Sequence, residues 1–143
     1  MKPWSHAGLV AAVLAGQPLA IPAEAVEAYR GELYCETSKD LAAIPDIVDF
    51  EVSIDGGKAS YTYVEPGQIA AEVALLDRGK GTVMDGQVEM VGGASTQVWQ
   101  LQSRYSGRVS KGRTVLTGTQ VWQGGGLAAP VSRACDAILT LIP

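Results

Sequence analysis

Apolar and polar residues alternate with a period of two through most of the chain after Tyr29, and this period predicts β-strands. Residues 29–36 and 48–54 each have an apolar face opposite a charged or polar one. Cys35 falls on the apolar face of the first of these segments. Both segments are therefore expected to be strands with one face turned toward a core.

Turn sequences join the early strands into hairpins. Asp55-Gly-Gly-Lys58 leads from the strand over 48–54 into one over 59–64, and its glycines supply the positive φ angles of a tight turn. Asp85-Gly86 marks a second hairpin, between Val83 and the strand that carries Val88.

The later half of the chain has the longest predicted strand, over residues 97–109. Ser110-Lys-Gly-Arg113 turns it into a strand over residues 114–122 that is rich in Thr and Val, residues that strands favour. Gly124-Gly-Gly126 interrupts the pattern before a last strand over residues 131–141, whose alternation places Cys135 on the inward face.

Two segments fit the period poorly. Residues 69–76 contain strong helix formers, with Ile69, Val73 and Leu76 at helical spacing, but both neighbouring segments are strands, which favours a strand here as well. The Gly-rich segment over residues 78–81 follows it. Residues 39–46 are expected to form an irregular loop or a single helical turn. Seven or eight short antiparallel strands predict an all-β fold, either a small up-and-down barrel or a sandwich.

The first 25 residues have the pattern of a secretory signal peptide. Lys2 precedes the apolar run Ala7–Ala15, and Ala23-Glu24-Ala25 offers a small-x-small cleavage site. The apolar run is much shorter than a membrane-spanning helix needs, which disfavours the alternative of an uncleaved anchor, and no later segment is long enough to be transmembrane. We expect one β domain over residues 26–143, exported to the periplasm or beyond the cell.

Cys35 and Cys135 are the only cysteines. In an exported protein two such cysteines are most simply a disulfide, and both lie on inward faces of the terminal strands. The alternative of a redox site is disfavoured because the chain has no Cys-x-x-Cys pair. We therefore predict a structural bridge between the first and last strands.

Composition excludes much of the common chemistry. The only histidine, His6, lies within the predicted signal peptide, so the exported domain would lack both the Ser-His-Asp triad and His-based metal or haem ligation. The 143-residue chain has a net charge of −4, which argues against a nucleic-acid partner. Asp49 and Glu51 are the candidate carboxylate pair, but they share a solvated face, where neither pKa would be raised for acid catalysis. We expect no enzymatic activity, no cofactor and no metal.

Charge is unevenly distributed between the two halves of the predicted domain. Residues 26–96 carry five basic and thirteen acidic side chains, whereas residues 97–143 carry five basic and one acidic. Four of those basic residues lie on the outward face of one strand and on the turn after it: Arg104, Arg108, Lys111 and Arg113. The simplest expectation is that these side chains pair with acids on adjacent strands. The alternative is a patch that binds a protein partner or an anionic component of the envelope.

Three aromatic residues are candidates for binding. Trp99 and Tyr105 share the apolar face of the strand over 97–109, so they belong either to the core or to the lining of a ligand cavity. Trp122 lies at a strand end beside the glycine run, where exposure would let it anchor a protein interface.

Three short motifs resemble a group of small exported bacterial proteins of unknown function with a cysteine near each end. They are Tyr105-Ser-Gly-Arg-Val109, Leu116-Thr-Gly-Thr-Gln-Val-Trp122 and Arg133-Ala-Cys-Asp-Ala-Ile-Leu139. The resemblance covers residues 29–141 and implies a one-disulfide β fold. Leu-Thr-Gly-Thr also occurs in avidin-like barrels, where it is a strand segment and not the ligand site.

The sequence thus favours an exported, non-enzymatic β domain that acts as a binding or accessory module, or as a small subunit of an envelope assembly. The competing hypothesis is a small-ligand-carrying barrel, lipocalin- or avidin-like in shape, with Trp99 and Tyr105 in its cavity.

Overall fold

The structure, a computed structural model, describes residues 25–36, 48–65 and 75–143. They form eight strands: β1 (Glu27–Cys35), β2 (Val48–Asp55), β3 (Lys58–Glu65), β4 (Leu75–Met84), β5 (Gln87–Ser95), β6 (Trp99–Ser110), β7 (Arg113–Gly124) and β8 (Val131–Leu141). The prediction of an all-β fold with seven or eight strands is confirmed. The predicted signal peptide, apart from Ala25, and the predicted loop over 39–46 lie outside the described residues.

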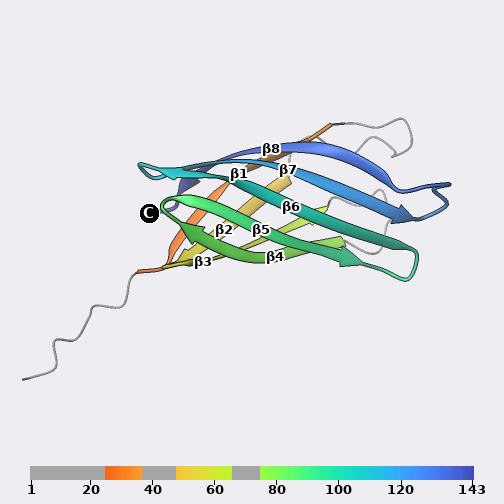
Figure 1. The fold of residues 1–143 in the computed structure, drawn as a ribbon, viewed down its shortest axis with the longest axis horizontal. Coiled ribbons are helices and arrows are strands. Elements are labelled where there is room, and N and C mark those ends of the chain that lie inside the picture. Colours follow the sequence, from red (N-terminus) through yellow and green to blue (C-terminus); the bar gives the residue numbers. More distant parts are fainter. Residues whose placement is uncertain (1–24, 37–47, 66–74) are drawn as a thin grey trace, which may run out of the picture.

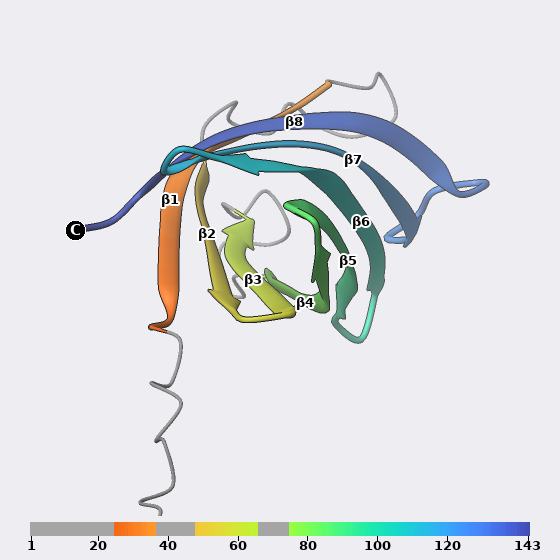
Figure 2. The same cartoon turned by 60° about the vertical axis from the view of Figure 1, so that its left-hand side comes forward.

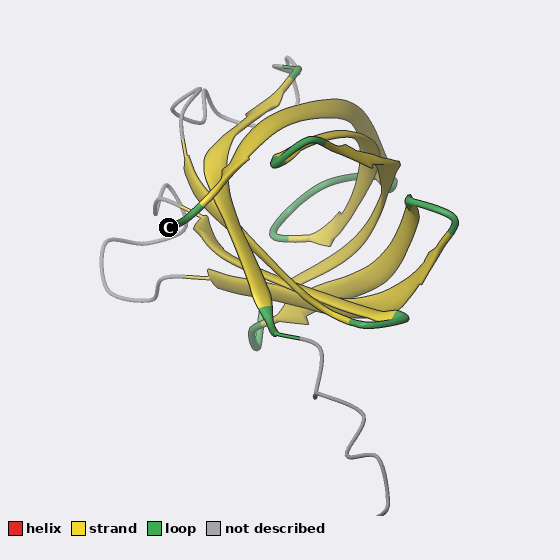
Figure 3. Cartoon of the chain, turned by 90° about the vertical axis from the view of Figure 1, so that its left-hand side faces the viewer, coloured by secondary structure: helices red, strands yellow, loops and turns green. Residues whose placement is uncertain are grey.

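The strands close into a barrel in chain order. Each strand pairs antiparallel with the next, and β8 pairs with β1. Figure 1 shows the barrel from the side, and in Figure 2 the strands follow one another around it until β8 passes back over β1. The view in Figure 3 shows the closed ring of strands. Closure decides between the two predicted architectures in favour of the barrel, which leaves no strand edge unpaired.

The predicted faces of the strands are confirmed by burial. Phe50 and Val52 of β2 and Leu101 and Tyr105 of β6 are buried inside the barrel, while Arg104 of β6 is exposed. Both early hairpins are present, and Asp85 takes the positive φ of 51° that the turn after β4 requires.

The strand expected over residues 69–76 is only partly described. Residues 69–74 lie outside the described part of the chain, and β4 begins at Leu75. β4 then continues through the Gly-rich segment over residues 78–81, which therefore belongs to the strand and does not follow it. Gly79 lies in it directly opposite Tyr61 of β3, whose ring fills the space that a side chain at Gly79 would occupy. A glycine that interrupts the apolar–polar alternation is here a strand position without a side chain, which leaves room for a neighbouring ring.

The two ends of the barrel differ in their connections. One end, hereafter the turn end, has the three tight turns at 55–58, 84–87 and 110–113, and β1 starts and β8 finishes there. At the other end, hereafter the loop end, β5 connects to β6 and β7 connects to β8, and β2 and β4 begin there.

The predicted disulfide is present. Cys35 and Cys135 are direct partners in the β1–β8 pair, with an S–S distance of 2.04 Å and a Cα–Cα distance of 4.0 Å. The bridge therefore joins the two strands whose pairing closes the barrel.

Candidate functional site

The barrel interior changes character along its axis. Toward the turn end it is filled by apolar side chains such as Ile54, Val88, Leu116 and Leu139. Toward the loop end, the described residues include four buried polar side chains: Asp77, Ser103, Gln120 and Arg133. Because buried polar groups are costly unless they are hydrogen-bonded, their grouping in one half of the barrel marks this region as the candidate site.

Asp77 is the buried carboxylate of this site and has no exposed surface. Tyr61 donates a hydrogen bond to its Oδ1 at 3.0 Å, and Ser103 donates to its Oδ2 at 2.5 Å. The three residues come from β4, β3 and β6, so the carboxylate links strands across the barrel. Hydrogen bonds to a charged acceptor are the stronger kind, and here they offset part of the cost of burying the charge.

Gln120 is the centre of a second set of hydrogen bonds. Its side-chain amide nitrogen donates to the hydroxyl groups of Tyr63 and Tyr105, the latter at 3.0 Å. Its carbonyl oxygen accepts from Nε1 of Trp122 at 3.2 Å and from Nε of Arg133 at 2.8 Å. Both ends of one amide are thus satisfied, which fixes the positions of four side chains from four strands.

The tyrosine hydroxyls have raised pKa values. Burial is the main cause for both Tyr61 and Tyr105, and the negative charge of Asp77 adds to it. Ser103, which donates to Asp77, lies near enough to both hydroxyls to oppose these increases in part. The neutral phenols therefore remain hydrogen-bond donors throughout the physiological pH range.

Aromatic rings fill the middle of the barrel beneath this polar region. The centroid of Phe50 lies 5.4 Å from that of Tyr61 and 5.1 Å from that of Tyr105, and the two tyrosine rings meet edge to face at 5.0 Å. Tyr105 also lies against Gly118, where a side chain would overlap the ring. This packing places Tyr105 in the core and not along the wall of a cavity.

Above the polar region, at the loop end, lies a second apolar cluster, which we call the mouth. Buried Leu101 and Trp122 form its base, and the half-buried side chains around them are Ala94, Trp99, Leu127 and Val131. The rings of Trp99 and Trp122 meet edge to face at 5.8 Å, and the guanidinium of Arg133 lies 5.4 Å from the Trp122 centroid. A groove of about 400 Å³ opens beside Trp99 along the β5–β6 connection. The mouth thus combines aromatic surface with buried hydrogen-bonding groups directly beneath it.

The predictions for the three aromatic candidates were only partly correct. Trp99 and Tyr105 point inward as predicted. The expectation that Trp122 would be exposed is wrong, because only 1% of it is accessible. The inward alternation of β7 continues through Gln120 to Trp122, and the glycine run starts two residues later.

The simplest expectation for the basic residues is also wrong. Arg104 is flanked on its neighbouring strands by Val91 and Thr119, and Arg108 by Gln87 and Val115, so no acid lies directly opposite either one. Within the part of the chain that the structure describes, neither arginine forms an ion pair. The only exposed ion pair found there joins Arg30 to Glu51 at 3.0 Å, on the outer surface. Glu51 is one of the two carboxylates of the candidate pair, so that carboxylate already has a partner.

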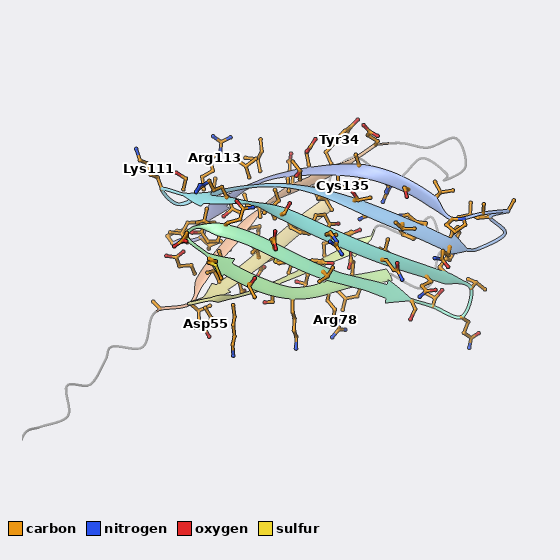
Figure 4. The ribbon with its side chains drawn as sticks, in the orientation of Figure 1. Tyr34, Asp55, Arg78, Lys111, Arg113 and Cys135 are labelled. Carbon is orange, nitrogen blue, oxygen red and sulfur yellow. A yellow bond between two sulfur atoms is a disulfide. The ribbon has the colours of Figure 1, made fainter. Side chains whose placement is uncertain are left out.

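The four predicted basic residues do not form one patch. Lys111 and Arg113 lie at the turn end, as Figure 4 shows. Ser110, the partner of Arg113, lies six positions after Arg104 on β6, a distance of about 20 Å along an extended strand. Arg104 belongs to a different part of the outer surface.

Sequence reasoning missed the polar members of the interior site. A usable signal was present, because each of three polar residues occupies an inward position of an alternating strand. Ser103 lies between Leu101 and Tyr105, Gln120 precedes Trp122 by two residues, and Arg133 precedes Cys135 by two. Asp77 lacked such a signal, since β4 has glycines at its next two inward positions.

Comparison of the chain with models of protein families found no matching family, and comparison with curated proteins found no relative. Within the described ranges, no three side chains of His, Cys, Asp or Glu gather in a way that could hold a metal ion. Those ranges also contain no helix long and apolar enough to cross a membrane.

Proposed function

We propose that this protein is a non-enzymatic binding protein, a small barrel that takes up one small amphipathic molecule at its mouth. The apolar part of the ligand would lie against Trp99 and Leu127. Its hydrogen-bonding group would reach the region of Gln120 and Arg133. This is the ligand-carrying barrel that the sequence also allowed, but with the ligand at the loop end instead of in a cavity in the middle of the barrel.

The observation that carries this proposal is the placement of the buried polar groups. A barrel that needs only to be stable can fill its interior with apolar side chains, as the turn end does here. Asp77, Ser103, Gln120 and Arg133 instead gather beneath a cluster in which Trp122 is buried and Trp99 is half-buried. Concave apolar surface with a few converging polar groups is the usual composition of a small-molecule site.

Binding is favoured over catalysis because Asp77 and Glu51 are both held by hydrogen-bonding or charged partners. Asp77 is held by donors from Tyr61 and Ser103, and Glu51 is paired with Arg30 on the outer surface. General acid–base catalysis needs a titrating group with access to its substrate, which neither arrangement favours.

We further propose that the protein is exported, with cleavage after Ala25. The disulfide between β1 and β8 supports this, because such bridges persist in oxidising compartments. Sequencing the N-terminus of protein taken from the periplasm or medium should give Val26. Retention of Met1 would contradict the proposal.

Fluorescence offers a direct test of the mouth. Trp99 and Trp122 are the only tryptophans after Ala25, and both lie there, so energy transfer from tryptophan to bound anilinonaphthalene sulfonate reports occupancy of this end. Leu127→Asp should abolish the transfer by adding a charge to the mouth. Met84→Asp, which puts the same charge on an exposed apolar residue at the turn end, should leave it unchanged. Absence of transfer in the native protein, or equal losses in both variants, would refute the proposed site.

A binding or accessory module that acts through the outer surface of the barrel is the second candidate. It is favoured by one observation, the outward arginines of β6 that no acid opposes on the neighbouring strands. The nature of the partner is taken up next.

A further inference from the structure

The outer face of β4, β5 and β6 concentrates positive charge in a chain of net negative charge. Arg78 and Lys80 point outward from β4, and Arg104 and Arg108 from β6, and all four are exposed. Only Glu89 of β5 adds an acid between them, and it forms no ion pair with them in the described part of the chain. We call these four cations the basic face.

The strand register brings three of these cations together. Lys80 and Arg104 are the two cross-strand partners of Val91, so their Cα atoms lie about 10 Å apart across β5. Arg78 is the partner of Gly93, two residues further along the same strand. Figure 4 shows the Arg78 side chain extending away from the barrel. A ligand that lies along β5 would therefore meet cations on both sides.

A groove of about 440 Å³ adjoins this cluster on the side of β6 and β7. Its lining includes Arg104, the amide side chain of Gln102 and the hydroxyl of Thr119, with Val91 and Val121 as apolar walls. Val91 is 55% exposed. The groove thus offers one charged group, hydrogen-bonding groups and a small apolar surface, which suits a ring that carries hydroxyl groups and an acid.

The same surface fits other polyanions poorly. Single-stranded nucleic acids bind through stacking on aromatic side chains, and the outward residues of β4, β5 and β6 include no aromatic residue. A lipid bilayer presents a flat sheet of charge, whereas the cations here flank a groove on the side of a barrel.

From these observations we infer that the basic face and its groove bind an acidic polysaccharide, a sugar chain bearing carboxylate or sulfate groups. Arg104 would receive an acid group in the groove, with Lys80 and Arg78 on the far side of β5 receiving the next. This site is separate from the mouth. The polysaccharide proposal can therefore be confirmed or refuted independently of the ligand proposed for the mouth.

The test measures binding to soluble polysaccharides by calorimetry. Polygalacturonate supplies carboxylates, dextran sulfate supplies sulfates, and neutral dextran is the uncharged control. We expect binding to at least one acidic chain and none to neutral dextran. Affinity should fall as salt is raised, because exposed charges are screened.

Matched variants locate the site. Lys80→Gln with Arg104→Gln should weaken binding by about tenfold or more, the effect of removing two hydrogen bonds to charged groups. Lys111→Gln with Arg113→Gln removes the same charge from the turn end and should change affinity by about twofold or less, as expected for screened charges at a distance. Circular dichroism should show that both variants are folded.

Three outcomes would overturn the inference. These are no binding to either acidic chain, equal weakening by the two variant pairs, and tighter binding to vesicles of phosphatidylglycerol than to either polysaccharide. The last would assign the basic face to a membrane surface.

Discussion

The ring of Tyr61 lies in the space that a side chain at Gly79 would need. The two residues are direct partners across β3 and β4, and a Cβ atom added at Gly79 would overlap Cε1 of the ring. A Cβ atom added at Gly92, the partner of Gly79 on β5, would likewise overlap the Tyr61 hydroxyl. Two bare positions on adjacent strands thus allow one tyrosine to lie across the inner faces of β4 and β5 and reach Asp77.

Gly79→Ala should therefore destabilise the barrel by about 1–3 kcal/mol, the usual cost of overpacking a core. Urea unfolding followed by circular dichroism measures the effect. Gly57→Ala is the control, since a Cβ there would have its nearest neighbour at 3.7 Å and Gly57 lies in a turn. If both substitutions cost the same, the fit between Tyr61 and Gly79 does not matter for stability.

Removal of the carboxylate from the interior site should be costly. Asp77→Ala leaves Tyr61 and Ser103 without their acceptor, and hydrogen bonds to charged groups contribute about 1.5–3 kcal/mol each. A lower free energy of unfolding and a lower melting temperature are expected. Thr62→Ala, on the exposed face of β3, provides the control for substitution in this part of the sheet.

Thr114 should tolerate loss of its hydroxyl group. It is fully buried in the apolar half, and its Oγ1 has no hydrogen-bond partner among the described residues. Thr114→Val removes that polar atom at nearly constant volume, so we expect stability to rise by about 1 kcal/mol, at the lower end of the cost of an unpaired buried group. A drop in the urea midpoint would show that the hydroxyl does have a partner.

High pH should unfold the barrel. The pKa values of Tyr61 and Tyr105 are raised by burial and by Asp77, and that of Tyr29 is raised to about 12 by burial and by its hydrogen bond to Glu27. The unfolded chain loses its phenolic protons near pH 10 while the folded barrel retains them. The contribution of these tyrosines to stability is therefore constant below pH 10 and falls as pH rises above it. Tyrosinate absorbance and circular dichroism should therefore change together above pH 10. Ionisation of these buried phenols before any loss of structure would contradict the described packing.

Opening the Cys35–Cys135 bridge should also cost stability. The bridge spans 100 residues of sequence, for which the chain-entropy account gives up to about 4.7 kcal/mol. The double substitution Cys35→Ser with Cys135→Ser should lower the urea midpoint, and reductant should then have no further effect on the variant. An unchanged midpoint would mean that the hydrogen bonds between β1 and β8 close the barrel unaided.

Much of the fold follows from the period of two and from the turn sequences. The strand over 131–141, the hairpin at Asp85-Gly86 and the inward faces of both cysteines are all found as predicted. The period cannot by itself choose a barrel over a sandwich, because closure depends on β8 meeting β1. That is a relation between chain ends which no local pattern encodes.

The candidate site was less accessible to sequence reasoning. Inward polar residues such as Gln120 were overlooked, because a single polar residue within an apolar face is locally indistinguishable from an imperfect pattern. Trp122 was misplaced because the glycines after it indicated the end of a strand, while its side chain follows the alternation of the residues before it. The neighbours of Arg104 on β5 and β7 depend on the register between the strands. A single segment of sequence does not reveal that register.

The position of the chain ends also has a practical consequence. β8 finishes at the turn end, where the backbone N–H of Ile142 bonds to the carbonyl of Ala28 at 2.8 Å, and the mouth lies at the opposite pole. A fluorescent reporter or a surface tether attached after Pro143 would therefore leave the mouth pointing away from the attachment. An immobilised barrel would thus present Trp99 and Leu127 to the surrounding solution.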